Sequence, residues 1–123
     1  MPQRILVVDD DKDVRDMICR TLEASGYEAI PAAGGRQAVQ RLEQDAPDLV
    51  ITDVVMPEMD GYEVLRRLQF LAPKVRALVM SGGGNPLPEH CLDAARRLGA
   101  PAILRKPFTR AEMLAAVQQA LNP

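Results

Sequence analysis

Short apolar runs alternate with amphipathic segments five times along the chain. The runs are rich in aliphatic and β-branched residues, as strands are, and lie at Arg4–Asp9, Tyr27–Ala32, Asp48–Asp53, Val75–Ser81 and Ala102–Arg105. The first, third and fourth runs are almost continuously apolar. This pattern is typical of parallel strands that are covered on both faces.

Between these runs, apolar residues recur at steps of three and four positions, the spacing of one face of an α-helix. The positions are Val14, Met17, Ile18 and Leu22; Ala38, Val39, Leu42 and Ala46; Val64, Leu65, Leu68 and Ala72; Leu92, Ala95 and Leu98; and Leu114, Val117 and Leu121. Strands that alternate with helices predict an α/β fold, with helices on both faces of a mostly parallel sheet.

The ends of the predicted helices carry recognisable signals. Two pairs have the N-cap and N3 spacing of a capping box, namely Asp60 with Glu63 and Thr109 with Glu112. Gly26 and Gly99 stand where the first and fourth helices are expected to end. Asp11 and Asp13 follow a strand and precede a helix, so we interpret them as capping or turn residues.

Length, charge and hydropathy narrow the classes of protein. A chain of 123 residues has the size of one domain, and we assign residues 1–123 to it. Fifteen basic against seventeen acidic residues give no positive field for nucleic acid. The apolar runs are too short to span a membrane, and early charges argue against a secretory signal, so we expect a cytoplasmic protein. Cys19 and Cys91 lack metal-site spacing and are expected to be simple thiols.

Polar side chains end four of the five predicted strands. The first strand ends in Asp9 and Asp10, the third in Asp53 and the fourth in Ser81, and the fifth runs into Lys106. Ligands of open parallel sheets bind outside the carboxyl ends of the strands. Each of these residues alone is a weak signal, but their joint occurrence at four strand ends predicts a functional site.

Three aspartates at one edge of a sheet would repel one another unless a cation binds between them. Oxygen ligands suit a hard ion, and Mg²⁺ is therefore the expected metal. An aspartate beside such an ion can attack phosphorus, because the metal and a nearby ammonium offset the charge of the transferring group. We expect one of these aspartates to be that nucleophile, Lys106 to supply the ammonium, and the Ser81 hydroxyl to bind another phosphoryl oxygen.

Three segments together resemble the receiver domain of two-component response regulators: Ile5–Asp11, Asp53–Gly61 and Lys106–Phe108. The resemblance extends from Arg4 through the last helix. It implies a flavodoxin-like, doubly wound (βα)5 fold whose five parallel strands have the order 2-1-3-4-5. It also implies a cis peptide bond between Lys106 and Pro107.

The same resemblance assigns roles and partners. Asp53 would accept a phosphoryl group from a sensor histidine kinase or a histidine phosphotransferase. Asp10, Asp53 and the backbone carbonyl of Val55 would bind Mg²⁺ directly, and Asp9 would act through the water shell of the metal. Ser81 and Lys106 would contact the phosphoryl group. The chain is expected to be a stand-alone receiver that signals to an unidentified protein through its fourth helix, fifth strand and fifth helix.

Two departures from the family pattern bear on switching and on phosphoryl lifetime. The family usually has Tyr or Phe three residues before the lysine, where this chain has Ile103, so a rotating ring cannot carry the signal. Val55 and Gly83 occupy the positions that flank the path of the hydrolytic water in this family, and neither has a polar side chain. We therefore expect slow autodephosphorylation. His90, the single histidine, is expected to lie on the surface outside any relay.

Two other classes of protein share part of this pattern. Phosphohydrolases of the haloacid dehalogenase type also use a nucleophilic aspartate after a strand, but they need a second acid where this chain has Val55. A flavodoxin-like binding module has the same fold, but three aspartates would repel a flavin phosphate, and no phosphate-binding loop follows the first strand.

Overall fold

The structure, a computed structural model, describes residues 2–53, 61–81 and 103–122. Its strands are β1 (Arg4–Val8), β2 (Glu28–Ala32), β3 (Leu49–Asp53), β4 (Arg76–Ser81) and β5 (Ile103–Arg105). Its helices are α1 (Lys12–Ala24), α2 (Gly35–Gln44), α3 (Gly61–Leu71) and α5 (Arg110–Leu121). The predicted fourth helix, with its terminal Gly99, lies outside the described residues.

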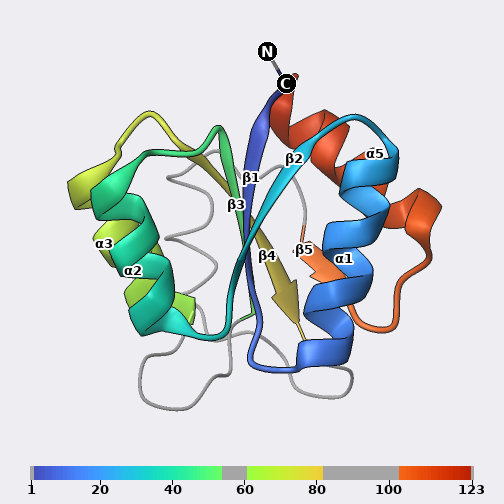
Figure 1. The fold of residues 1–123 in the computed structure, drawn as a ribbon, viewed down its shortest axis with the longest axis horizontal. Coiled ribbons are helices and arrows are strands. Elements are labelled where there is room, and N and C mark those ends of the chain that lie inside the picture. The colour runs from blue at the N-terminus through green and yellow to red at the C-terminus, as the bar shows by residue number, and fades with distance from the viewer. Residues whose placement is uncertain (1, 54–60, 82–102, 123) are drawn as a thin grey trace.

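The five strands form one parallel sheet in the order β2-β1-β3-β4-β5. This order confirms the prediction. Figure 1 shows α2 and α3 on one face of the sheet and α1 and α5 on the other. The strands β1 and β3 are neighbours in the sheet. Because they are parallel, their carboxyl ends lie at the same edge.

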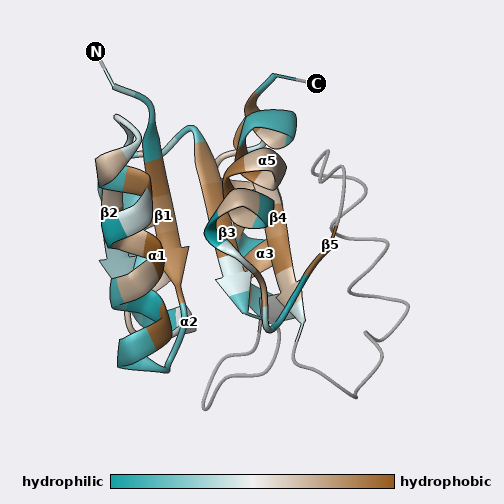
Figure 2. Ribbon diagram, turned by 90° about the vertical axis from the view of Figure 1, so that its right-hand side faces the viewer, coloured by the Kyte–Doolittle hydropathy of each residue, from teal (hydrophilic) through white to brown (hydrophobic). Residues whose placement is uncertain are grey.

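Alternate side chains of each strand enter two separate cores, because successive residues of a strand point to opposite faces. In β1, Leu6 and Val8 pack with α2 and α3, whereas Ile5 and Val7 pack with α1 and α5. All four are fully buried, and Figure 2 shows the central strands as an apolar layer between helices of mixed hydropathy. Burial on both faces explains why these strands read as continuous apolar runs.

Two of the predicted helical patterns need correction. Helix α2 ends at Gln44 with Asp45 as its C-cap, and Ala46 is exposed, so the prediction of Ala46 as part of that stripe was wrong. The buried residues of α5 are Met113, Ala116, Val117 and Ala120, whereas Leu114 and Leu121 are only partly buried. The buried face of α5 is therefore centred on these four residues, and the two leucines pack at its border.

Capping residues fix the ends of α1 and α5 as the sequence predicts. The Asp11 carboxylate accepts hydrogen bonds from the backbone N–H groups of Asp13 and Val14, which makes Asp11 the N-cap of α1. Past the other end of α1, Gly26 has a φ of 93°, a left-handed conformation that side chains disfavour. Thr109 and Glu112 form a reciprocal capping box at α5.

None of the described helices is both long enough and apolar enough to serve as a bilayer span.

Candidate functional site

The predicted site residues that the structure describes lie at the carboxyl edge of the sheet. Asp9 directly follows β1, Asp53 is the last residue of β3, and Ser81 is the last residue of β4. Lys106 directly follows β5, and its backbone N–H donates to the carbonyl of Ser81 at 2.9 Å. Parallel strands all end at the same edge, which is why residues distant in sequence meet here.

One ammonium group joins two of the aspartates. Lys106 Nζ lies 2.8 Å from Asp9 Oδ2 and 2.8 Å from Asp53 Oδ2. Asp9 is fully buried and Asp53 is 9% exposed, whereas Asp10 is exposed. The carboxylates of Asp9, Asp10 and Asp53 each offer an oxygen atom within 4.8 Å of the other two. The site is thus a buried pair of carboxylates with one open, solvent-facing side.

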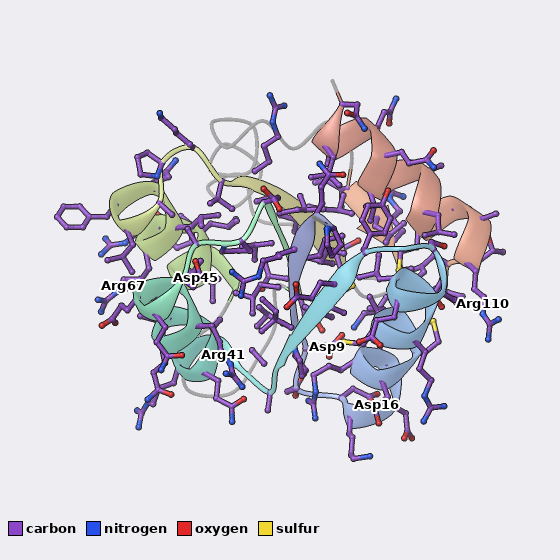
Figure 3. All side chains as sticks on the ribbon, turned by 45° about the horizontal axis from the view of Figure 1, so that its top comes forward. Asp9, Asp16, Arg41, Asp45, Arg67 and Arg110 are labelled. Atoms are coloured by element: carbon purple, nitrogen blue, oxygen red, sulfur yellow. The ribbon has the colours of Figure 1, made fainter. Side chains whose placement is uncertain are left out.

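Asp9 is held on both its side chain and its backbone. Its Oδ1 accepts the backbone N–H of Asp11 at 2.9 Å, and its carbonyl accepts a guanidinium N–H of Arg15 at 2.8 Å. Burial raises the pKa of Asp9 above its ordinary value, although the hydrogen bonds from Lys106 and from the Asp11 backbone oppose that rise. Figure 3 shows Asp9 between β2 and α1, whereas Asp16 lies on α1 itself.

The charge of Lys106 is fixed by its two partners. Burial alone would lower its pKa, but the hydrogen bonds to Asp53 and Asp9 outweigh burial and raise the pKa of Lys106 above its ordinary value. Lys106 is therefore an ammonium at neutral pH. The peptide bond between Lys106 and Pro107 is cis, as the sequence resemblance implied.

Carboxylate oxygens are the ligands in this cluster, and no sulfur or imidazole takes part among the described residues. Such a donor set fits a hard divalent cation like Mg²⁺ rather than zinc or copper. The exposed side chain of Asp10 leaves the cluster open to solvent, so a bound ion could keep several waters, as Mg²⁺ prefers. The residues present therefore fit the predicted metal.

Sequence reasoning missed three contacts around the site. These are the direct bond from Lys106 to Asp9, the bond from Arg15 to the Asp9 carbonyl, and the Thr52 hydroxyl that donates to the Asp53 carbonyl at 3.0 Å. Thr52 is fully buried in β3. A polar residue directly before Asp53 was a visible signal for the last contact, whereas the other two depend on how α1 and β5 dock.

Several predicted positions lie outside the described residues: Val55, Asp60, Gly83, His90 and Cys91. Ser81 is described and is 7% exposed. Ile103, which stands where the family usually has an aromatic residue, is half-buried in β5 and pairs with Val79 of β4.

Comparison with known proteins gives one consistent family. The response regulator receiver domain family matches residues 5–118. Response regulator MprA of Mycolicibacterium vanbaalenii is 40% identical over 99% of this chain, which spans 52% of that protein. Sporulation initiation phosphotransferase F of Bacillus subtilis is 32% identical over 98% of this chain and 95% of its own length. The chain thus spans about half of the MprA protein but nearly all of the sporulation protein.

Solved structures agree with this match. The Vibrio cholerae chemotaxis protein CheY4 is 32% identical, with a TM-score of 0.84 over 98% of this chain and all of that one. A CheY-like receiver domain protein from Methanospirillum hungatei is 28% identical, with a TM-score of 0.88 over 99% of this chain and 95% of that one. The family match favours the receiver over the phosphohydrolase and the flavodoxin-like binding module. This chain belongs to the response regulator receiver domain family of two-component signalling proteins.

Proposed function

We propose that Asp53 is the residue that accepts the phosphoryl group, with a sensor histidine kinase or a histidine phosphotransferase as the donor. The observation that carries this proposal is the ammonium of Lys106, bound at 2.8 Å to both Asp53 and Asp9. Membership of the receiver family supports a phosphoacceptor role for the domain. The buried carboxylate at the end of β3, beside a fixed cation, is the group best suited to it.

The proposed phosphoryl transfer needs no reactant other than the phosphohistidine of the donor and the Asp53 carboxylate. A carboxylate oxygen of Asp53 forms a bond to phosphorus, the bond from phosphorus to the histidine nitrogen breaks, and the electron pair leaves with that nitrogen. Lys106 stays an ammonium and offsets negative charge on the transferring oxygens. We assign the Ser81 hydroxyl, at the neighbouring strand end, to a second phosphoryl oxygen.

We also propose Mg²⁺ as the cofactor, held directly by Asp10, Asp53 and the Val55 carbonyl, with Asp9 acting through metal-bound water. When bound, Mg²⁺ neutralises charge on the phosphoryl oxygens and orients them. Asp9 contributes by holding the Lys106 ammonium next to Asp53. Asp10, which is exposed, is the residue that can meet an ion arriving from solvent.

The remaining parts of the proposal concern output and setting. We propose that phosphorylation is read by an unidentified protein at the surface of the fourth helix, β5 and α5, without an aromatic switch because Ile103 takes that position. The chain would act as a phosphoacceptor that catalyses its own modification and loses the phosphoryl group slowly. We further propose that residues 1–123 act as one domain in the cytoplasm, without contact with nucleic acid or membrane.

The experiment that tests the phosphoacceptor is intact-mass measurement after incubation with Mg²⁺ and acetyl phosphate. The wild type should gain one phosphoryl adduct, and Asp53→Asn should gain none. Asp16→Asn is the matched control, because Asp16 lies on α1 in a surface pair with Lys12 and should label like the wild type. An adduct that persists in Asp53→Asn would overturn the assignment.

The metal is tested separately by thermal melting with and without MgCl₂. Binding to the folded state raises the melting temperature, and the rise should be lost in Asp10→Asn. EDTA should also abolish labelling of the wild type. A rise that is unchanged in Asp10→Asn would remove this residue from the metal site but leave the role of Asp53 standing.

A further inference from the structure

The outward face of α3 carries an apolar side chain where a surface helix is normally polar. Its inward face is ordinary, because Val64, Leu65 and Leu68 are buried in the core. On the opposite face, Phe70 is 88% exposed, and Leu71, which ends the helix at the border of the inward face, is 41% exposed. Phe70 is one of the two phenylalanines of the chain, so half of its phenylalanine side chains face solvent here.

Phe70 belongs to a stripe rather than standing alone. Glu63, Arg66, Arg67 and Phe70 recur at steps of three and four residues, so they share one side of the helix. Together with Gln69 and Leu71, the last three of them line a shallow hollow of about 500 Å³. We call Arg66, Arg67, Gln69, Phe70 and Leu71 the α3 patch. Protein-binding surfaces commonly have an apolar centre and a polar rim, and they are enriched in aromatic residues and arginine.

The charges of the α3 patch specify the kind of partner. Arg66 Nε lies 3.4 Å from one Glu63 carboxylate oxygen, and Arg67 Nε lies 3.3 Å from the other. Two guanidinium groups therefore share one carboxylate and leave a net positive charge. Their side chains are 59% and 51% exposed, so a partner can reach them. Guanidinium groups bind carboxylates in a two-pronged geometry and are frequent in binding hot spots.

We propose that the α3 patch binds a protein segment in which an apolar side chain is flanked by aspartate or glutamate. The apolar side chain would pack on Phe70 and Leu71, and the carboxylates would pair with Arg66 and Arg67. A second copy of this chain is a poor occupant, because α3 packed against α3 would set arginines against arginines. This surface is independent of the proposed phosphoacceptor, because Phe70 is in the last turn of α3, whereas the predicted site lies at the strand ends that lead into the helices.

A selection experiment tests the proposal even though the partner is unidentified. A randomised peptide library displayed on phage is selected on the wild-type protein after depletion on Phe70→Ser. Peptides that remain should carry an apolar residue flanked by acidic ones. Synthetic versions should bind Phe70→Ser and Arg67→Ala at least about tenfold more weakly than wild type. They should bind Arg110→Ala like wild type, because Arg110 lies on the other side of the molecule from Arg67 (Figure 3).

Several results would overturn this proposal. One is a depleted library that yields no binders, or binders without acidic residues. Another is Phe70-dependent binding of the protein to vesicles of phosphatidylcholine with phosphatidylglycerol, which would assign the patch to a membrane surface. Phe70-dependent self-association in sedimentation would assign it to a second copy. Acetyl phosphate labelling of Phe70→Ser should equal that of wild type, which keeps this test separate from the test of Asp53.

Discussion

The two edges of the sheet carry similar charges in opposite surroundings. At the carboxyl edge, Lys106 binds Asp9 and Asp53 at 2.8 Å, and the three side chains are 22%, 0% and 12% exposed. At the amino edge, the Arg4 guanidinium pairs with Asp45 and Glu28, whose side chains are 65% and 53% exposed. The cations differ little, with side chains 22% exposed for Lys106 and 30% exposed for Arg4, but water screens the carboxylates of the second cluster more strongly. The difference teaches that the two clusters are set apart by the burial of their carboxylates rather than by their number of charges.

The direction of the helices adds to this contrast. Each helix that follows a parallel strand begins at the carboxyl edge and ends at the amino edge, so the positive ends of the helix dipoles gather around the aspartates. The N-cap Asp11 and the Thr109 capping box lie at this edge. The fold therefore supplies partial positive charge at the edge where aspartates are buried. At the amino edge, the exposed carboxylates are stabilised mainly by water.

Replacing Lys106, the cation of the carboxyl edge, should have the largest effect on both stability and labelling. Lys106→Met leaves Asp9 and Asp53 without their shared ammonium, so we expect the free energy of unfolding to fall by about 3 kcal/mol, as when one partner of a buried ion pair is removed. Acetyl phosphate labelling should slow by roughly 100-fold, as for loss of one charge-stabilising donor. Urea unfolding and intact-mass kinetics measure the two effects.

The matched control for that change is Lys12→Met. Lys12 forms an exposed pair with Asp16 at 3.0 Å on the surface of α1, so its loss should cost less than about 0.5 kcal/mol. Equal stability of Lys106→Met and Lys12→Met would show that burial of the Lys106 pair adds nothing to its contribution to stability.

Double-mutant cycles would compare the two edges directly. The cycle of Lys106→Met with Asp53→Asn should give a coupling energy of about 2 kcal/mol, within the range for contacting groups. The cycle of Arg4→Met with Asp45→Asn should give less than about 0.5 kcal/mol, because the Asp45 side chain is 65% exposed and water screens the pair. Urea unfolding of each set of four proteins provides the energies. A larger coupling at the amino edge would reverse the comparison.

The sequence predicts more of the carboxyl edge than of the amino edge, for a physical reason. Strand ends are marked by a change from apolar to polar residues, so Asp9, Asp53, Ser81 and Lys106 can be located from the pattern alone. Their convergence then follows from the parallel topology. By contrast, the ion pair between Arg4 and Asp45 depends on how the end of α2 packs against the start of β1. No local sequence pattern predicts that packing.

The same reasoning explains the errors within the fold. Periodicity fixes which residues share a helix face but not where the helix ends, so Ala46 was assigned to α2, although Asp45 already caps it. In α5, two of the buried residues are alanines, and alanines carry little weight in a hydrophobic pattern. The contact between Lys106 and Asp9 needed the docked position of a lysine side chain, which spacing cannot give.

Loss of the cap that follows Lys106 should have an intermediate effect. The Thr109 hydroxyl accepts the Glu112 backbone N–H at 3.0 Å, so Thr109→Ala should lower the free energy of unfolding by about 1 kcal/mol. The effect should fall on stability and leave the labelling rate within about twofold of wild type, because the site contacts of Lys106 remain. A labelling rate as slow as that of Lys106→Met would mean that the cap positions the lysine.

The pH dependence of the cap provides its control. The Glu112 carboxylate accepts the Thr109 backbone N–H at 2.9 Å, and this bond lowers the pKa of Glu112 below its ordinary value of 4.5. The stabilisation is thus present above pH 4.5 and is lost as pH falls through the lowered pKa. Glu112→Gln should be less stable than wild type at neutral pH, and urea unfolding at about pH 3 should find the two more alike.

Removing the cation of the amino edge should have a smaller effect than removing Lys106, although the Arg4 guanidinium pairs with two carboxylates, as the Lys106 ammonium does. Arg4→Met breaks the side-chain pairs with Asp45 and Glu28 but keeps the 2.7 Å bond from the Arg4 backbone N–H to Asp48. We expect a loss below about 1 kcal/mol, and less at high salt, because exposed pairs are screened. Labelling of Asp53 should not change. A loss of unfolding free energy as large as that of Lys106→Met would mean that the exposed Arg4 ion pairs stabilise the fold as much as the buried Lys106 pairs do.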